Sequence, residues 1–419
     1  MGWFGRPGPR EAVRREGLIF SAFALAFFMS YGLRAVNAVL APHLVAEFSL
    51  SASELGALSS AYFVTFALMQ LPLGIWLDRY GSRRVEALLL LFAALGCGLF
   101  ATAQSFTALW IARALIGAGL SACLMAALKA FRFWFVAHLQ QRLAAWILVC
   151  GTTGALVSTV PVAWLVAFWG WRPTFLAAAL MLLGCAAFLW YGLPRDEEAA
   201  SRQPSQASGG YRAVFTNPFL LRAVPSLIMF QGGFLALQTL WAGPWMTQVL
   251  ALSTGAAARA LMALNAALLA SFLVLGWIAP RIAARGWDGP RVMRAAALLT
   301  LITESAIVLS LAEQAWILWL VLAATSTVFT LLQTEVALSF PQGLGGRAYT
   351  GLNMLLFGGA FALQWGFGAV IDLATSLGET TTGAYQRAML VLIMLQLASL
   401  IPLRSRVPHQ LPHQTPDTG

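Results

Sequence analysis

Long apolar runs dominate this 419-residue chain and restrict what it can fold into. A helix needs about 20 apolar residues to cross the hydrocarbon core of a bilayer. Runs of this kind fall near residues 18–41, 52–76, 86–104, 107–128, 143–166, 171–193, 221–243, 257–281, 292–312, 315–338, 348–372 and 386–402. The sequence therefore predicts an all-α membrane protein with 12 transmembrane helices, of which the last is the shortest.

The runs divide into two sets of six, separated by a stretch rich in Ser, Gln, Gly and charge. Secondary transporters are often built as two parallel repeats with a solute site at the midplane between them. The predicted organisation is an N-terminal tail, a six-helix half, a cytoplasmic linker, a second six-helix half and a C-terminal tail, at residues 1–17, 18–193, 194–220, 221–402 and 403–419.

The positive charges predict the orientation in the membrane. Twenty-one lysines and arginines fall in the tails and loops of one side, against three on the other, namely Arg172, Arg259 and Arg387. The positive-inside rule then places both termini in the cytoplasm. The first apolar run is too long for a signal-peptide core and lacks a small-residue cleavage site, so we expect a retained helix.

Other classes of protein fit the sequence less well. The net charge of +10 is spread over many short loops and forms no dense patch, which argues against nucleic acid as a partner. We find no P-loop, zinc motif or nucleophile elbow, so we expect neither an enzyme nor a cofactor. Four cysteines lie inside apolar runs without metal or disulfide spacing and are predicted to be core residues: Cys97, Cys123, Cys150 and Cys185.

A charged turn between the second and third runs reads GIWLDRYGSRR, from Gly74 to Arg84. Glycine permits a tight turn, and an aspartate can pair with nearby cations or lie at the positive end of a helix. The pattern closely resembles the cytoplasmic signature of the major facilitator superfamily, with the motif residues Gly74, Asp78, Arg79, Gly81, Arg83 and Arg84.

Other segments agree with this resemblance, which covers essentially the whole chain. They are a decayed copy of the motif at 276–292, the Arg-x-x-x-Gly-x-Gly pattern at 113–119, and the segments 170–175 and 345–353. The resemblance implies that spans 1, 4, 7 and 10 line a cavity, that spans 2, 5, 8 and 11 join the halves, and that spans 3, 6, 9 and 12 pack outside. It also implies alternating access, with the motif loop latching the cytoplasmic side of the outward-facing state and Asp78 near the start of span 11.

Two arginines lie inside apolar runs, Arg34 on span 1 and Arg113 on span 4. Each lies about five residues, or roughly 7 Å, from its span midpoint toward the outside. Arginine inside a membrane usually faces a cavity or a partner, and its guanidinium suits a carboxylate or phosphate. The segment with Tyr31, Arg34 and Asn37 resembles the first helix of organic-anion symporters and organophosphate antiporters, in which this arginine meets the substrate.

The chain departs from that pattern at the proton-carrying carboxylates. Organic-anion symporters often have Asp before the helix 1 arginine and Glu two turns after the helix 4 arginine, where this chain has Leu33 and Leu120. Glu335 on span 10 is a candidate for proton coupling, or for an ion pair at the inner gate. For Glu304 on span 9 we expect a local hydrogen bond. The coupling ion, a proton among the candidates, therefore stays open.

Uncharged candidates for solute contact lie on span 7, where Gln231 and Gln238 are seven residues apart and so share a helical face. Their alternative role is packing between helices. We expect an inner-membrane protein of a bacterium, monomeric in lipid, that moves a small anionic solute.

Two further functions compete with that reading. A proton-coupled drug or metabolite exporter would carry Gly-x-x-x-Gly-Pro on span 5, but Pro161 lies seven residues after Gly154. A non-transporting sensor would be expected to have longer cytoplasmic segments than these tails and this linker.

Overall fold

The computed structural model describes residues 9–193, 211–284, 289–340 and 345–402, and all of their regular structure is helical. The helices of the first half are α1 (Pro9–Ala35), α2 (Asn37–Phe48), α3 (Ala52–Tyr80), α4 (Ser82–Thr102), α5 (Phe106–Gly119), α6 (Cys123–Trp134), α7 (Ala137–Val157), α8 (Val160–Trp169) and α9 (Trp171–Gly192). Six predicted spans thus become nine helices, because three spans are bent.

The bends lie at Val36, at 120–122 and at 158–159, and a proline follows two of them. Pro161 lies in the first turn of α8, where its missing N–H would have no partner in any case. Pro42 lies inside α2, and its ring opposes the carbonyl one turn earlier. The turn from α3 to α4 is made by Gly81, whose φ of 80° is unfavourable for other residues.

The second half begins with the short helix α10 (Tyr211–Phe215), which lies in the stretch predicted as linker. Span 7 follows as α11 (Pro218–Ser226), η1 (Leu227–Gly232), α12 (Gly233–Ala236), η2 (Leu237–Trp241), α13 (Ala242–Pro244) and η3 (Trp245–Val249), where η1, η2 and η3 are π-helical. The remaining elements are α14 (Thr254–Ala284), α15 (Gly289–Leu309), the 3₁₀ turn η4 (Glu313–Ala315), α16 (Trp316–Leu338), α17 (Gly345–Ser376) and α18 (Thr381–Ser399).

Among the described residues, ten helices are long and apolar enough to cross a membrane, and the bent pair α7 and α8 makes an eleventh span. The helix α18 occupies the place of the predicted twelfth span but is not in that set. Its length of 19 residues suits a span, while Thr381, Gln386, Arg387 and Gln396 reduce its apolar character. The chain is therefore a multi-pass membrane protein.

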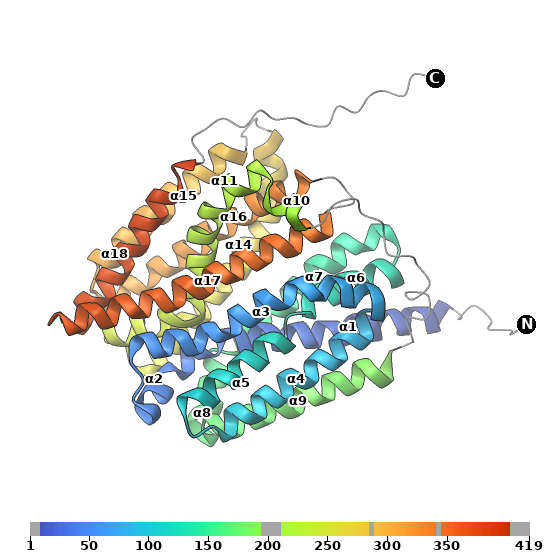
Figure 1. Cartoon of the computed structure of the whole chain (residues 1–419), viewed down its shortest axis with the longest axis horizontal. Coiled ribbons are helices and arrows are strands. Elements are labelled where there is room, and N and C mark those ends of the chain that lie inside the picture. The colour runs from blue at the N-terminus through green and yellow to red at the C-terminus, as the bar shows by residue number, and fades with distance from the viewer. Residues whose placement is uncertain (1–8, 194–210, 285–288, 341–344, 403–419) are drawn as a thin grey trace, which may run out of the picture.

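The two halves meet along α3 and α17, which run side by side through the centre of the molecule (Figure 1). Helices α4, α5 and α9 lie on one side of this pair, and α15, α16 and α18 lie on the other. Further contacts between halves join α14 to α7 and α8, and join α2 to η2 and α13. Predicted spans 2 and 11, and 5 and 8, thus form the contact that the resemblance implies.

The halves are held together at the end of the bundle where α3 begins, here called the far end; the opposite end, with the turn at Gly81, is the loop end. The Asp372 carboxylate of α17 accepts hydrogen bonds from the backbone N–H groups of Ala52 (2.9 Å) and Ser53 (2.7 Å). A carboxylate is favourable at a helix N-terminus, where backbone N–H groups are free. One turn earlier, a Cβ on Gly368 would come within 2.3 Å of the Ala52 carbonyl oxygen, so the two backbones touch.

Candidate functional site

Arg34 lies at the junction of the halves, inside a cage of four aromatic rings. Its guanidinium carbon is 4.4 Å from the ring centroid of Tyr31, 5.4 Å from Phe66 and 5.9 Å from Tyr62. The fourth ring, Phe357 of α17, comes from the other half and is 5.3 Å away. A guanidinium near aromatic faces is attracted by the negative charge of the rings. The cage therefore stabilises the charge of Arg34 without neutralising it.

No carboxylate in the described part of the chain forms an ion pair with Arg34, although its side chain is only 7% exposed. Its Nε also lacks a hydrogen-bond partner. A buried charge without a partner is costly in a membrane, and such residues commonly mark a solute pathway. The geometry thus leaves Arg34 able to bind an anion that enters between the halves.

Arg113, the second arginine, is hydrogen-bonded to the backbone of α1. Its Nη1 donates a hydrogen bond of 2.9 Å to the Leu33 carbonyl oxygen, and its guanidinium carbon is 5.5 Å from the Tyr62 ring. Leu33 directly precedes Arg34 and lies at the bend between α1 and α2. Arg113 and Arg34 therefore share the ring of Tyr62, but Arg113 holds the backbone while Arg34 faces the other half.

Asn37, the third predicted residue of this segment, packs against α3. Its Nδ2 donates a hydrogen bond of 3.0 Å to the Ser59 hydroxyl, and the side chain is 1% exposed. Tyr31 is half-buried and covers the guanidinium from its own helix. In this conformation Tyr31 is part of the Arg34 cage, whereas Asn37 joins two helices of one half.

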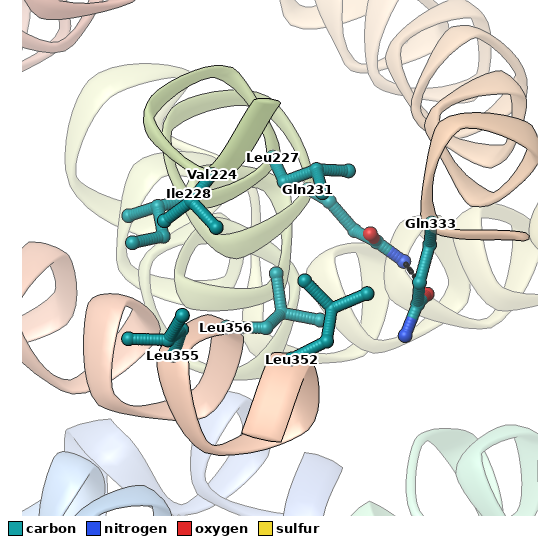
Figure 2. A pocket seen from close by; sticks show the side chains of 8 residues that line it. All are labelled: Val224, Leu227, Ile228, Gln231, Gln333, Leu352, Leu355 and Leu356. Atoms are coloured by element: carbon teal, nitrogen blue, oxygen red, sulfur yellow. Dashed lines mark hydrogen bonds between the residues drawn. The ribbon is translucent and has the colours of Figure 1, made fainter. Parts of the chain in front are cut away.

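Gln231 of η1 belongs to a chain of amides that crosses three helices. Its Nε2 donates to Gln333 Oε1 of α16 at 3.2 Å, and Gln333 Nε2 donates to Asn353 Oδ1 of α17 at 3.1 Å. Figure 2 shows the two glutamines pointing toward each other at the edge of a small crevice, whose other walls are apolar. The Oε1 atom of Gln231 is buried without a partner, so this amide can still accept a hydrogen bond.

Gln238, on η2, lies deeper in the second half than Gln231. Its Nε2 donates to Asn265 Oδ1 of α14 at 2.8 Å, and Asn265 in turn donates to the Leu261 carbonyl oxygen at 2.9 Å. This bond holds span 7 against span 8. The predicted solute contact of Gln238 is thus not visible in this arrangement and stays a prediction.

The motif loop is held by bonds within the first half. Asp78 accepts from Lys129 Nζ of α6 at 2.6 Å, and the same ammonium donates to the Leu77 carbonyl oxygen at 2.7 Å. Arg83 donates to the carbonyl oxygens of Trp190 and Leu193 at the end of α9. Asp78 therefore ties the end of α3 to the end of α6, and its proximity to the start of span 11 stays a prediction.

The other motif residues divide into a turn and an exposed face. Gly81 makes the turn, while Arg79 and Arg84 are exposed on either side of it. A Cβ built on Gly74 would meet no atom within 4 Å, so no close approach explains that glycine here.

Glu304, Glu335 and Glu86 are acidic residues inside spans, away from the contacts already described. Glu304 of α15 accepts a hydrogen bond of 3.1 Å from Gln396 Nε2 of α18, not from Thr300 or Ser305 as a local bond would require. The side chain of Glu335 lies outside the described part of the structure. Sequence reasoning overlooked Glu86 of α4, which is fully buried; its signal was its place as the first residue of the predicted span 86–104.

Comparison with known proteins places this geometry in a family. The family model described as "Major Facilitator Superfamily" matches residues 22–363. The hexuronate transporter of Escherichia coli (strain K12) is 30% identical over 176 residues, which is 42% of this chain and 41% of that protein. The galacturonate transporter of Dickeya chrysanthemi is 28% identical over 177 residues, 42% of this chain and 51% of that protein. These alignments span only about half, or less, of the curated relatives.

The fold is also found among solved structures. The crystal structure of a bacterial homolog to the human lysosomal transporter Spinster, in an inward-facing and occupied conformation, matches with a TM-score of 0.74. That match covers 92% of this chain and 95% of that chain at 16% identity, so it speaks for the fold alone. The predicted family is confirmed by the model match over most of the chain: this protein belongs to the Major Facilitator Superfamily.

Proposed function

We propose that this protein is a secondary transporter that moves a small organic anion across the bacterial inner membrane by alternating access. The observation that carries the proposal is Arg34: a buried guanidinium between the halves, without a carboxylate partner in the described part of the chain. A carboxylate of the solute would supply the missing partner through two parallel hydrogen bonds.

The position of Phe357 supports alternating access at this site. Because Arg34 belongs to the first half and Phe357 to the second, an anion on Arg34 contacts or displaces a residue of the opposite half. Binding then favours one arrangement of the halves over another, as a transport cycle requires. Gln231 lies on the second half with a free amide oxygen, which suits a hydroxyl of the solute.

The names of the relatives point to the class of anion. The hexuronate and galacturonate transporters are named for sugar acids, which carry one carboxylate and several hydroxyls. Such a solute matches one guanidinium with two tyrosines nearby. For Arg113 we propose a positioning role through Leu33, and direct contact with the solute stays a prediction.

The positive charges support an orientation with the loop end in the cytoplasm. The far end, where Asp372 joins α17 to α3, would then face outward and be closed in this conformation. We further expect a monomer in the membrane.

The test is thermal unfolding of the purified protein in detergent with D-glucuronate, D-galacturonate, D-glucose and tetraphenylphosphonium. A ligand that binds the native state raises Tm by mass action. We expect a sugar acid to stabilise the wild type. In Arg34→Gln its affinity should fall by about 10- to 100-fold, the loss of a hydrogen bond to a charged group.

Arg212→Gln, an exposed arginine of α10, is the matched control and should respond as the wild type does. If only the cation stabilises the protein, and Arg34→Gln responds equally, Arg34 is structural and the exporter reading is favoured instead.

A further inference from the structure

Glu86 is a buried carboxyl that the Arg34 site does not use. It lies on α4 with 0% exposure, and neither carboxyl oxygen has a hydrogen-bond partner in the part of the chain that the structure describes. Arg83, one turn earlier on the same helix, donates instead to carbonyl oxygens at the end of α9. An ionised carboxylate without a cation is very costly in apolar surroundings, so Glu86 carries its proton in this conformation.

The groups that face Glu86 are weakly polar. They are the thiols of Cys123 on α6 and Cys185 on α9, with the Ser30 hydroxyl of α1 bordering Cys123. Arg113 of α5 faces Cys97 of α4, not Glu86, and the described residues of α3 contribute no titratable partner. Among the described residues no cation bonds to the carboxyl of Glu86, so water would have to solvate the carboxylate if its proton left.

The carboxyl lies beside a break in span 4. Helix α5 ends at Gly119 and α6 begins at Cys123, and the Leu120 N–H bonds back to the carbonyl oxygen of Ile116. A break in a helix is a place where the backbone can change direction without disrupting a full ladder of hydrogen bonds. Glu86 is four residues from the start of α4, so it lies about 6 Å along the helix from the loop end.

Close backbone contacts connect the helix of Glu86 to the helix of Arg113. A Cβ on Gly119 would come within 2.4 Å of Ala93 N, and one on Gly96 would come within 2.8 Å of the Ala112 carbonyl oxygen. The first contact lies two turns beyond Glu86 on α4, and the second lies next to Arg113 on α5. Helices in such contact move together, since their packed surfaces do not deform continuously.

A chain of contacts thus leads from the buried carboxyl to the anion site. It runs from α4 through the glycine contacts to Arg113, and from Arg113 through the Leu33 carbonyl to Arg34. We propose that Glu86 is the proton-carrying group of this transporter and that its protonation is coupled to the anion at Arg34. The coupling to an anion rests on the proposed function, whereas proton binding by Glu86 does not.

The proposed step is a simple proton transfer. The carboxylic acid of Glu86 gives its O–H proton to water at the loop end when the break at 120–122 opens, and the carboxylate takes a proton back from water that enters from the far end in the next cycle. No other bond forms or breaks. Linkage requires that the anion and the proton change each other's affinity by the same factor. A coupling of this kind would replace the carboxylates that are absent at Leu33 and Leu120.

The first experiment needs no solute. Infrared difference spectra of the purified protein, titrated from mildly acidic to alkaline pH, report the carbonyl stretch of protonated carboxyls. We expect a band that titrates in the wild type, is missing in Glu86→Gln, and persists in Glu304→Gln, the matched buried glutamate of the second half. The proposal would be overturned if wild type and Glu86→Gln showed the same bands, or if the band missing in Glu86→Gln did not change with pH in the wild type.

The second experiment measures coupling in proteoliposomes that enclose a pH-sensitive dye, with D-galacturonate as the probe. The wild type should move protons with the anion. Glu86→Gln, a neutral variant of the same shape, should keep anion counterflow and lose at least tenfold in proton flux, while Glu304→Gln keeps both. Equal proton flux in wild type and Glu86→Gln contradicts the proposal. A titrating Glu86 band without any anion flux in the wild type supports the proton site and overturns the proposed function.

Discussion

The guanidinium of Arg34 lies 5.3 Å from the ring of Phe357, so a charged residue of the first half rests on an aromatic residue of the second. Phe357 also lies 4.4 Å from Phe66, ring centroid to ring centroid, which extends the contact along α3. The arginine of the candidate site is thus in contact with both halves of the molecule.

This contact should be measurable as a coupling energy. In a double-mutant cycle of Arg34→Gln and Phe357→Leu, we expect a coupling of about 0.5–2 kcal/mol in thermal or denaturant unfolding, the range of cation–π pairs. The free-energy cost of the cavity left by the smaller leucine cancels in the cycle, because it occurs both with and without Arg34. Additive effects of the two substitutions would show that the halves do not communicate through this pair.

Replacing Asp372 with Asn should loosen the far end. The variant keeps the shape of the side chain but replaces charge-assisted bonds to Ala52 and Ser53 with neutral ones. A loss of about 1–2 kcal/mol would shift the balance between closed and open far ends about 5- to 30-fold.

The rate at which an impermeant maleimide labels a cysteine introduced at Ser53 measures how often the far end opens. We expect this rate to be higher in Asp372→Asn than in the protein with Asp372. Glu54→Gln is the control, because Glu54 caps the same helix end within one half. An unchanged labelling rate in Asp372→Asn would mean that the hydrogen bonds of Asp372 do not limit opening of the far end.

The adjacent motif arginines should respond differently to the same substitution. Arg83 is buried and its Nη1 donates to two carbonyl oxygens, Trp190 at 3.0 Å and Leu193 at 2.9 Å, whereas Arg84 is exposed. Arg83→Lys keeps the charge but replaces the planar guanidinium, whose Nη1 reaches both carbonyl oxygens, so we expect a loss of about 1–3 kcal/mol in unfolding free energy. Arg84→Lys should stay within about 0.5 kcal/mol of the wild type, as exposed substitutions usually do. Equal Tm values for both variants would contradict this assignment.

The ion pair between α2 and α9 predicts a dependence of stability on pH. Burial raises the pKa of Glu47, but the hydrogen bonds from Arg172 and Trp171 and the charge of Arg172 together outweigh it and leave the pKa below its usual value. A depressed pKa in the folded state gives stability that is present above the unfolded pKa of about 4.3 and is lost as pH falls through the folded value.

We therefore expect the Tm difference between wild type and Glu47→Gln to be constant near neutral pH and to shrink on acidification below about pH 4.3. Thermal melts of both proteins over a pH series measure it. The effect should be small because the pair is exposed to solvent. A difference that grows on acidification would have the wrong sign for this ion pair.

The sequence predicted the helices well because apolar length is a direct consequence of bilayer thickness. It did not predict the bends at Val36 and 120–122, because these depend on tertiary partners such as Arg113, which donates to the Leu33 carbonyl oxygen. The family motifs were recognisable because charged residues inside or between membrane helices are rare.

The candidate site was predicted only in part. Arg34 and Tyr31 stand out as polar residues in an apolar run, but Phe357 does not, since nothing in the sequence distinguishes it from other phenylalanines of span 11. Glu86 was missed for a related reason. It lies three residues after Arg83 at the end of the motif, where a charge is expected to be solvated, and only the packing of α4, α6 and α9 reveals that it is buried.

The π-helical turns of span 7 allow that helix to rearrange its hydrogen bonds locally, which a regular α-helix does not. Each such turn contains one residue more than an α turn and closes its hydrogen bonds over a longer step, as the Leu250 N–H does to the Trp245 carbonyl oxygen. When a few backbone hydrogen bonds change between the α and the π pattern, the extra residue moves to the neighbouring turn. The segment it crosses then rotates by about 100°, one residue of an α-helix, with hardly any change in length. Span 7 can thus rotate Gln231 or Gln238 about the helix axis while its two ends stay in place.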